Sequence, residues 1–164
     1  MIPMGKRTGI DRHGLSGLLI FLWAAALAGI ACNVGASAPS SPWTPKDVVE
    51  PATLAAQLKK SGEKPLLVQV GFRSLYDQGH IPGSTYCGPA FRADGLAKLK
   101  ECVAGVPRTK EILLYCGCCP WEECPNLRPA FEALSQMGFK QVRVLYIPHN
   151  FGRDWAQKGY PTER

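Results

Sequence analysis

Residues 112–137 read ILLYCGCCPWEECPNLRPAFEALSQM, and this stretch decides the fold that we expect. It opens with Ile112 to Tyr115, an apolar run of strand length that is typical of a strand buried in a parallel sheet. Four cysteines follow within nine residues. Leu127 to Met137 then has helical spacing, and Gly138 suits the C-terminal end of a helix. The stretch therefore predicts a central strand, a thiol-rich loop and a covering helix.

The rest of the chain repeats this alternation. Leu66–Val70 and Val142–Tyr146 are further apolar runs of strand length, and Val48–Val49 reads as a short edge strand. Helical spacing marks residues 52–60 and 96–103. Strands separated by helices predict an α/β fold with a central, mostly parallel sheet and helices on both faces. Ligands of such sheets bind beyond the carboxyl ends of the strands, which is where the thiol-rich loop is expected.

Residues 1–31 have the pattern of an export signal, in which Lys6, Arg7 and Arg12 precede an apolar run over residues 15–31. The run ends before Cys32 in a context that resembles a bacterial lipoprotein box. Three outcomes stay open: lipidation of Cys32 after cleavage, cleavage without lipidation, and retention as an N-terminal membrane anchor. Each places the protein in the periplasm or on the outside face of the membrane, where disulfides are permitted.

The composition of the chain indicates how its remaining segments are organised and which classes of partner it can bind. Residues 32–45 are rich in Ser, Ala, Gly and Pro and predict a flexible linker, which leaves one domain over residues 46–164. The formal net charge of +6 falls to about +4 once the three basic residues and one acidic residue of the leader are set aside. Because basic residues are not interleaved with aromatic ones, we expect no nucleic-acid binding. A mild positive surplus suits a small anionic substrate.

Cys116 is the expected nucleophile because it directly follows the central strand and faces the start of the next helix. The partial positive charge of that helix end predicts a lowered pKa for its thiol. Asn126 is expected to cap the helix, and Arg128 in its first turn would lie near the thiolate or near a bound anion. The loop thus offers a nucleophile and an anion cradle together.

The other cysteines leave alternatives open. Cys118, Cys119 and Cys124 can act as resolving thiols, as ligands of a soft metal, or as partners in a structural disulfide. A Cys119–Cys124 disulfide is the simplest of these in an oxidising compartment. We expect Cys87 and Cys102 to be packing residues, although either can be a distant disulfide partner.

Three segments of the chain resemble the rhodanese family. Residues 66–83 resemble its first signature, and Gly79-His80-Ile81-Pro82-Gly83 matches the signature's turn fully. Residues 111–130 resemble the second signature, in which the cysteine after the strand carries the transferred sulfur. Residues 144–161 resemble the C-terminal strand and helix with the closing Gly-Tyr-Pro. The resemblance covers residues 46–164 and implies a rhodanese-like three-layer fold, in which His80 is a turn residue rather than a catalytic base.

The chain departs from the family pattern at two places. Gln69-Val70-Gly71 stands where the family usually carries Asp-Val-Arg. The loop from Cys116 to Arg128 is longer than the compact six-residue loop of the family's sulfurtransferases. Its sequence, Cys-Gly-Cys-Cys-Pro-Trp-x-x-Cys-Pro-Asn, resembles that of a distinct subgroup of single-domain rhodanese-like proteins. For Trp121 we expect packing on the domain rather than a place in the pocket wall, and we assign no role to His149.

The resemblance implies a sulfurtransferase without a cofactor or metal. Cys116 would take a sulfane sulfur from thiosulfate or a persulfide donor and pass it to a thiol or cyanide-like acceptor. Arg128 would bind the anionic donor, while the amides of Gly117 and Cys118 would hold the persulfide. The rival hypothesis is a non-catalytic thiol module outside the cytoplasm that binds copper or zinc or senses redox state.

Overall fold

The computed structural model describes residues 41–164 of the 164-residue chain. The predicted leader, the lipidation of Cys32 and most of the predicted linker lie outside the described residues. Trp43, near the end of that linker, packs its ring edge-on against Phe131 with the ring centroids 5.8 Å apart. Within residues 41–164, no helix is long and apolar enough to cross a membrane.

Five strands form one sheet in which every neighbouring pair is parallel, in the order β1-β5-β4-β2-β3. The strands are β1 (Val48–Val49), β2 (Leu66–Gln69), β3 (Thr85–Tyr86), β4 (Ile112–Tyr115) and β5 (Val142–Leu145). The α/β fold with a parallel sheet is confirmed. The two-residue strand β3 was not predicted, because Thr85 and Tyr86 are too few to show a periodic pattern.

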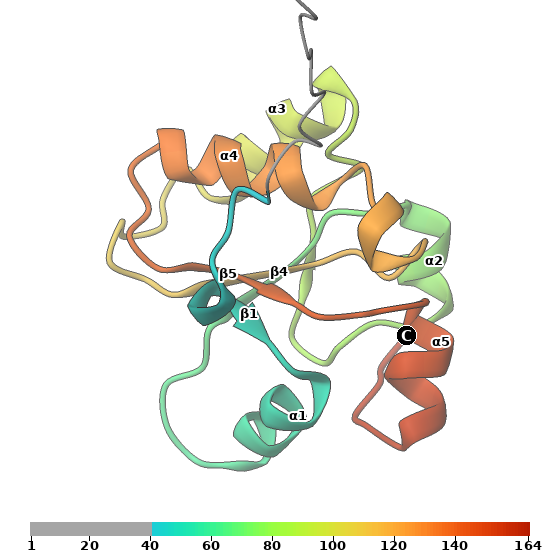
Figure 1. The fold of residues 1–164 in the computed structure, drawn as a ribbon. Helices are drawn as coiled ribbons and strands as arrows, with labels where there is room; N and C mark the ends of the chain where they lie inside the picture. Colours follow the sequence, from blue (N-terminus) through green and yellow to red (C-terminus); the bar gives the residue numbers. More distant parts are fainter. Residues whose placement is uncertain (1–40) are drawn as a thin grey trace, which may run out of the picture. The chain divides into compact units, whose positions relative to one another are not determined.

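Helices cover both faces of the sheet (Figure 1). The α-helices are α1 (Pro51–Lys59), α2 (Arg73–Gln78), α3 (Ala93–Cys102), α4 (Leu127–Gln136) and α5 (Phe151–Asp154). Single 3-10 turns are η1 (Pro45–Asp47), η2 (Trp121–Glu123) and η3 (Ala156–Lys158). The predicted helices 52–60, 96–103 and 127–137 correspond to α1, α3 and α4 with ends that differ by at most three residues.

Strand β4 lies in the centre of the sheet and is buried on both sides. Its side chains alternate between two apolar cores, so that Ile112 and Leu114 pack toward α3 and α4. Leu113 and Tyr115 pack toward α1 and the segment after α5. All four residues are at most 1% exposed. Because the strand is fixed from both faces, the first loop residues after it start from a rigid support.

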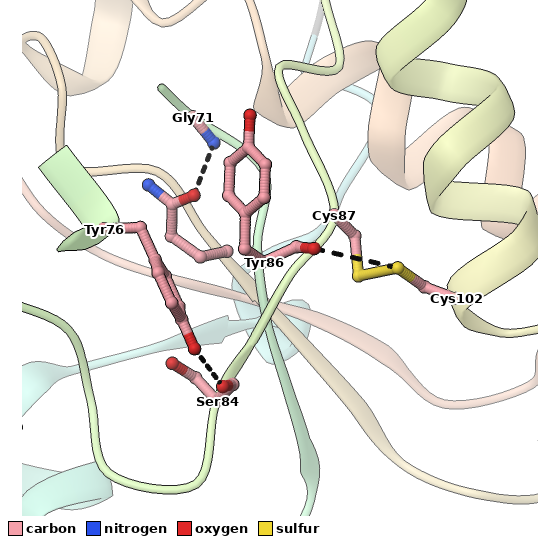
Figure 2. The surroundings of a disulfide bond; sticks show 7 residues. Gly71, Tyr76, Ser84, Tyr86, Cys87 and Cys102 are labelled. Atoms are coloured by element: carbon pink, nitrogen blue, oxygen red, sulfur yellow. Dashed lines mark hydrogen bonds between the residues drawn. A yellow bond between two sulfur atoms is a disulfide. The ribbon is translucent and has the colours of Figure 1, made fainter. Parts of the chain in front are cut away.

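A disulfide joins Cys87 to Cys102, as Figure 2 shows. Cys87 follows the edge strand β3, and Cys102 is the last residue of α3. The bond therefore ties a covering helix to the edge of the sheet. The expectation that the two cysteines only pack is wrong, because the turn between β3 and α3 returns the chain and brings their Cα atoms within 6.3 Å.

The Asp154 carboxylate stabilises the turn between β5 and α5. Its Oδ2 accepts hydrogen bonds from the backbone N–H groups of His149 at 2.6 Å and Asn150 at 3.0 Å. Burial opposes ionisation, but these bonds outweigh it and lower the pKa of Asp154. A pKa that is lower in the folded state means that the carboxylate stabilises the fold above its unfolded pKa. That contribution is lost as the pH falls through the folded pKa.

We expect Asp154→Asn to lower the free energy of unfolding by about 1–2 kcal/mol at neutral pH, since a charged acceptor is replaced by a neutral one. The difference from the wild type should shrink as the pH falls below about 4, where the carboxyl of the unfolded chain becomes protonated, and should be smallest below the lower folded pKa. Urea unfolding at neutral and at acidic pH measures both quantities. An equal difference at both pH values would show that the charge of Asp154 is irrelevant.

Candidate active site

Gly117 turns the chain sharply at the carboxyl end of β4. Its φ of +71° is in the left-handed region that favours glycine. A Cβ atom there would lie 2.7 Å from the Cβ of Phe151, so a side chain is also excluded by space. The Gly117 carbonyl accepts a hydrogen bond from the Phe151 N–H at 3.0 Å. This turn brings Cys118 back against Cys116.

Four free thiols meet in this loop. The Sγ atom of Cys118 lies 3.0 Å from that of Cys116 and 3.2 Å from that of Cys119. The Sγ atoms of Cys116, Cys119 and Cys124 all lie within 4.8 Å of one another. The predicted Cys119–Cys124 disulfide is absent from the structure, in which all four thiols of the loop are free. We call these four residues the thiol cluster.

The thiol cluster carries its negative charge most readily on Cys118. Hydrogen bonds from the neighbouring thiols of Cys116 and Cys124 stabilise that thiolate and lower the pKa of Cys118. The pKa of Cys116 is raised instead, because its thiol donates to Cys118 and is only 3% exposed. The expectation of a lowered pKa for Cys116 is therefore wrong for the reduced cluster, because the thiols of Cys118 and Cys124 and the burial of Cys116 favour its neutral form.

Asn126 holds the thiol cluster from the side of α4. Its side chain is fully buried and its Nδ2 donates to the Sγ atoms of Cys116 at 3.4 Å and Cys118 at 3.7 Å. Its Oδ1 accepts from the Phe91 N–H at 3.1 Å. Asn126 precedes α4 as predicted, but its side chain does not cap the helix. The sequence pattern for a helix cap could not show that the amide turns toward the sulfur atoms.

A cavity of about 700 Å³ lies beside the thiol cluster. Gly117 and Cys118 form one wall, and Cys116 is not among the lining residues. The other walls come from the end of α2, the start of α5 and the C-terminus, with Gln78, Gly79, Asn150, Phe151, Glu163 and Arg164 among them. A small molecule in this cavity therefore meets Cys118 before Cys116.

The sulfur positions also fit a soft metal ion. Three thiolates around one ion at about 2.3 Å would be separated by roughly 4 Å. The mutual separations of Cys116, Cys119 and Cys124, all under 4.8 Å, allow that arrangement. Thiolates favour ions such as Cu(I) and Zn(II). The arrangement is thus compatible with either nucleophilic chemistry or metal binding.

The Rhodanese-like domain family matches residues 50–146, which is more than half of the chain. The chain belongs to the rhodanese-like family. A comparison with curated proteins finds no match.

Solved structures with this fold include three that illustrate its range. The Alr3790 protein from Anabaena is 21% identical, with a TM-score of 0.55 over 70% of this chain and 90% of its own. BH2092 from Bacillus halodurans is 22% identical, with a TM-score of 0.55 over 70% and 74%. Thiosulfate sulfurtransferase from Pseudomonas aeruginosa is 24% identical, with a TM-score of 0.54 over 77% of this chain and 21% of that protein. These identities establish a shared fold.

The rhodanese-like chain uses its unusual Gln69-Val70-Gly71 to support the cysteine loop. The buried Gln69 side chain donates from Nε2 to the Cys116 carbonyl at 3.2 Å. Its Oε1 accepts from the Gly71 N–H at 3.2 Å, the bond drawn at Gly71 in Figure 2. A Cβ on Gly71 would lie 2.9 Å from the Cys116 Sγ and 2.9 Å from the Gln69 Nε2. The absence of a side chain at position 71 therefore makes room for the thiol cluster.

We expect Gly71→Ala to lower the free energy of unfolding by about 1–3 kcal/mol, because the added methyl overpacks the site. It should also change the reactivity of the loop thiols toward a disulfide reagent, since the Cys116 sulfur must move. Gly105→Ala is the matched control, because nothing lies within 4 Å of the corresponding Cβ position. Equal stability and thiol reactivity in both variants would contradict this account.

The predicted donor-binding residue Arg128 lies on α4. Its Nη1 is 3.6 Å from the carboxylate of Glu132, one turn further along the helix. Arg128 does not line the cavity beside Cys118, whereas the C-terminal Arg164 does. Sequence reasoning missed Arg164, because only the return of the chain terminus to the loop after β4 brings it there.

The other residues considered in the sequence, His80, Trp121 and His149, contact neighbouring backbone or side chains. The Nδ1 of His80 lies 2.9 Å from the Tyr76 carbonyl and its ring stacks on Tyr76, which confirms it as a turn residue. The Trp121 ring packs edge-on against Trp43 and Tyr146, as expected for a tryptophan that packs on the domain. His149 contacts Asp154 with its Nδ1.

Proposed function

We propose that this protein is a sulfurtransferase that carries sulfane sulfur as a persulfide on Cys116. The observation that supports it best is the thiol pair of Cys116 and Cys118, 3.0 Å apart at the carboxyl end of β4 and beside the cavity. The donor is thiosulfate or another persulfide, and the acceptor is a thiol or a cyanide-like nucleophile. Membership of the rhodanese-like family is consistent with such partners.

In the first step the Cys116 sulfur attacks the outer sulfur of thiosulfate while its proton passes to the Cys118 thiolate across the short sulfur contact. The S–S bond of the donor breaks, and sulfite leaves with the electron pair. The amides of Gly117 and Cys118 hold the new outer sulfur, and Arg164 or Arg128 attracts the anionic donor. An acceptor nucleophile then removes the outer sulfur and restores Cys116.

The proposal is tested with the reduced full-length protein, thiosulfate and cyanide. We expect sulfite to form, together with thiocyanate to the extent that excess cyanide intercepts the Cys116 persulfide. A folded, fully reduced protein that releases no sulfite from thiosulfate, and accepts no sulfur from a persulfide donor, would rule the proposal out.

The mutual proximity of Cys116, Cys119 and Cys124 favours one second candidate, a module that binds copper or zinc or senses redox state. The metal content of protein purified under reducing conditions separates the two functions. Stoichiometric metal that is lost in Cys119→Ser and Cys124→Ser, together with absent sulfur transfer, would support the second candidate.

We also propose that the protein is exported and acts outside the cytoplasm, with Cys32 as the site of lipidation. The Cys87–Cys102 disulfide supports this location, because such bonds persist mainly in oxidising compartments. The intact mass of the protein recovered from its native membrane would show cleavage and lipidation at Cys32, or their absence.

A further inference from the structure

The contact between Cys116 and Cys118 is much closer than strand geometry alone would give. Residues i and i+2 of an extended strand point to the same side at a separation of about 7 Å. Here the left-handed turn at Gly117 reduces the separation of the two Sγ atoms to 3.0 Å. A disulfide requires about 2 Å, so a movement of roughly 1 Å would join the two sulfur atoms.

We propose that Cys118 is the resolving thiol of this site, which attacks the Cys116 persulfide, releases its outer sulfur as hydrosulfide and leaves a Cys116–Cys118 disulfide. The inference rests on the proposed persulfide chemistry and adds the fate of the sulfur. The protein then reduces sulfane sulfur, in addition to passing it to an acceptor.

The step balances without a further reactant. Cys118 is a thiol after it has taken the proton of Cys116, and the persulfide on Cys116 carries one negative charge. A new bond forms between the Sγ atoms of Cys118 and Cys116, and the bond between Cys116 and the outer sulfur breaks. The proton of Cys118 leaves with the outer sulfur as hydrosulfide. The Cys118 sulfur is oxidised and the outer sulfur is reduced.

Position favours Cys118 over the other thiols of the loop. The Sγ atom of Cys118 lies 3.0 Å from that of Cys116, and the buried amide of Asn126 reaches both sulfur atoms. Cys118 is also the thiol that lines the cavity, so hydrosulfide has a route out. Cys119 lies 3.2 Å from Cys118, but a bond between adjacent residues would leave the Cys116 persulfide unresolved.

Repeated turnover through the Cys116–Cys118 disulfide requires a dithiol reductant. Such a reductant attacks the accessible sulfur of the Cys116–Cys118 disulfide, which is that of Cys118, and exchange then frees both thiols. The open cavity wall at Gly117 and Cys118 is the surface at which it would approach. With thiosulfate as the donor and a dithiol instead of cyanide, hydrosulfide release should therefore continue over repeated turnovers.

A single turnover tests the inference. The reduced full-length protein is mixed anaerobically with one equivalent of thiosulfate and no acceptor. We expect the wild type to release sulfite and hydrosulfide in equal amounts, with an intact mass about 2 Da below that of the reduced protein. Peptide mapping should link Cys116 to Cys118. Cys118→Ser should release sulfite at the end point but no hydrosulfide, and should gain about 32 Da as a stable persulfide.

The other possible results of this single-turnover experiment distinguish the inference from its alternatives. Hydrosulfide release by Cys118→Ser at the wild-type level would overturn the inference, as would a wild-type protein that keeps the added sulfur. Cys119→Ser distinguishes the neighbouring thiol: loss of hydrosulfide there, with Cys118→Ser unaffected, would assign the step to Cys119. Absence of sulfite in the wild type would overturn the proposed function itself, and this inference with it.

Discussion

Cys116→Ser will lower the rate of sulfite release from thiosulfate by about a thousandfold or more, because it removes the nucleophile that forms the persulfide. A hydroxyl in that position is a poor nucleophile toward sulfur at neutral pH, and the Gln69 contact involves the Cys116 carbonyl, which serine retains. The loss should therefore reflect chemistry and not a displaced loop. Steady-state sulfite and thiocyanate formation by the reduced full-length variant measures it.

Thermal unfolding of Cys116→Ser provides the control, because a midpoint close to that of the wild type shows that the central strand and its loop are intact. The activity of Cys118→Ser should be measured alongside that of Cys116→Ser. If Cys116→Ser kept its activity and Cys118→Ser lost it, the persulfide would form on the thiol that lines the cavity. The assignment of Cys116, which depends on its position after β4, would then be wrong.

Replacing both Cys87 and Cys102 with alanine will lower the free energy of unfolding by about 3 kcal/mol. The two residues are 15 positions apart, and a closed loop of that length restricts the unfolded chain by about this amount. For a domain of this size the midpoint of thermal unfolding should fall on the order of 10 °C. Circular dichroism melts of the wild type and the double variant measure the shift.

Thermal melts in the presence of a reductant are the matched comparison for the Cys87–Cys102 disulfide. The reductant should lower the midpoint of the wild type toward that of the double variant, and it should leave the double variant almost unchanged. A wild type that melts at the same temperature with and without reductant would show that the bond contributes no stability. The thiol cluster is free in both proteins and does not affect the comparison.

Local sequence patterns were sufficient for the framework of the fold. Apolar runs of strand length identified β2, β4 and β5, since a strand covered on both faces requires apolar residues throughout. Helical spacing and glycine ends located α1, α3 and α4 to within three residues. The His80 turn followed from its motif, and its ring does contact the backbone of Tyr76. These features depend on residues that are neighbours in the chain.

The candidate site was predictable only in part. The position of Cys116 after β4 could be read from the chain, as could the concentration of thiols beside it. The sequence could not show that Asn126 turns toward the sulfur atoms, or that Gly71 leaves space for them. Arg164 likewise reaches the cavity only because the C-terminus returns to it.

The sequence by itself determined a parallel α/β domain with a cysteine at the end of its central strand, because strand burial and helix periodicity are local properties. The rhodanese type followed from the resemblance of its motifs to that family. Only the tertiary structure decided which thiols lie against one another, which cysteines are bonded and which side chains hold the loop. These contacts depend on atoms a few ångströms apart in space. Segments as distant as β2, β4 and the start of α4 bring those atoms together.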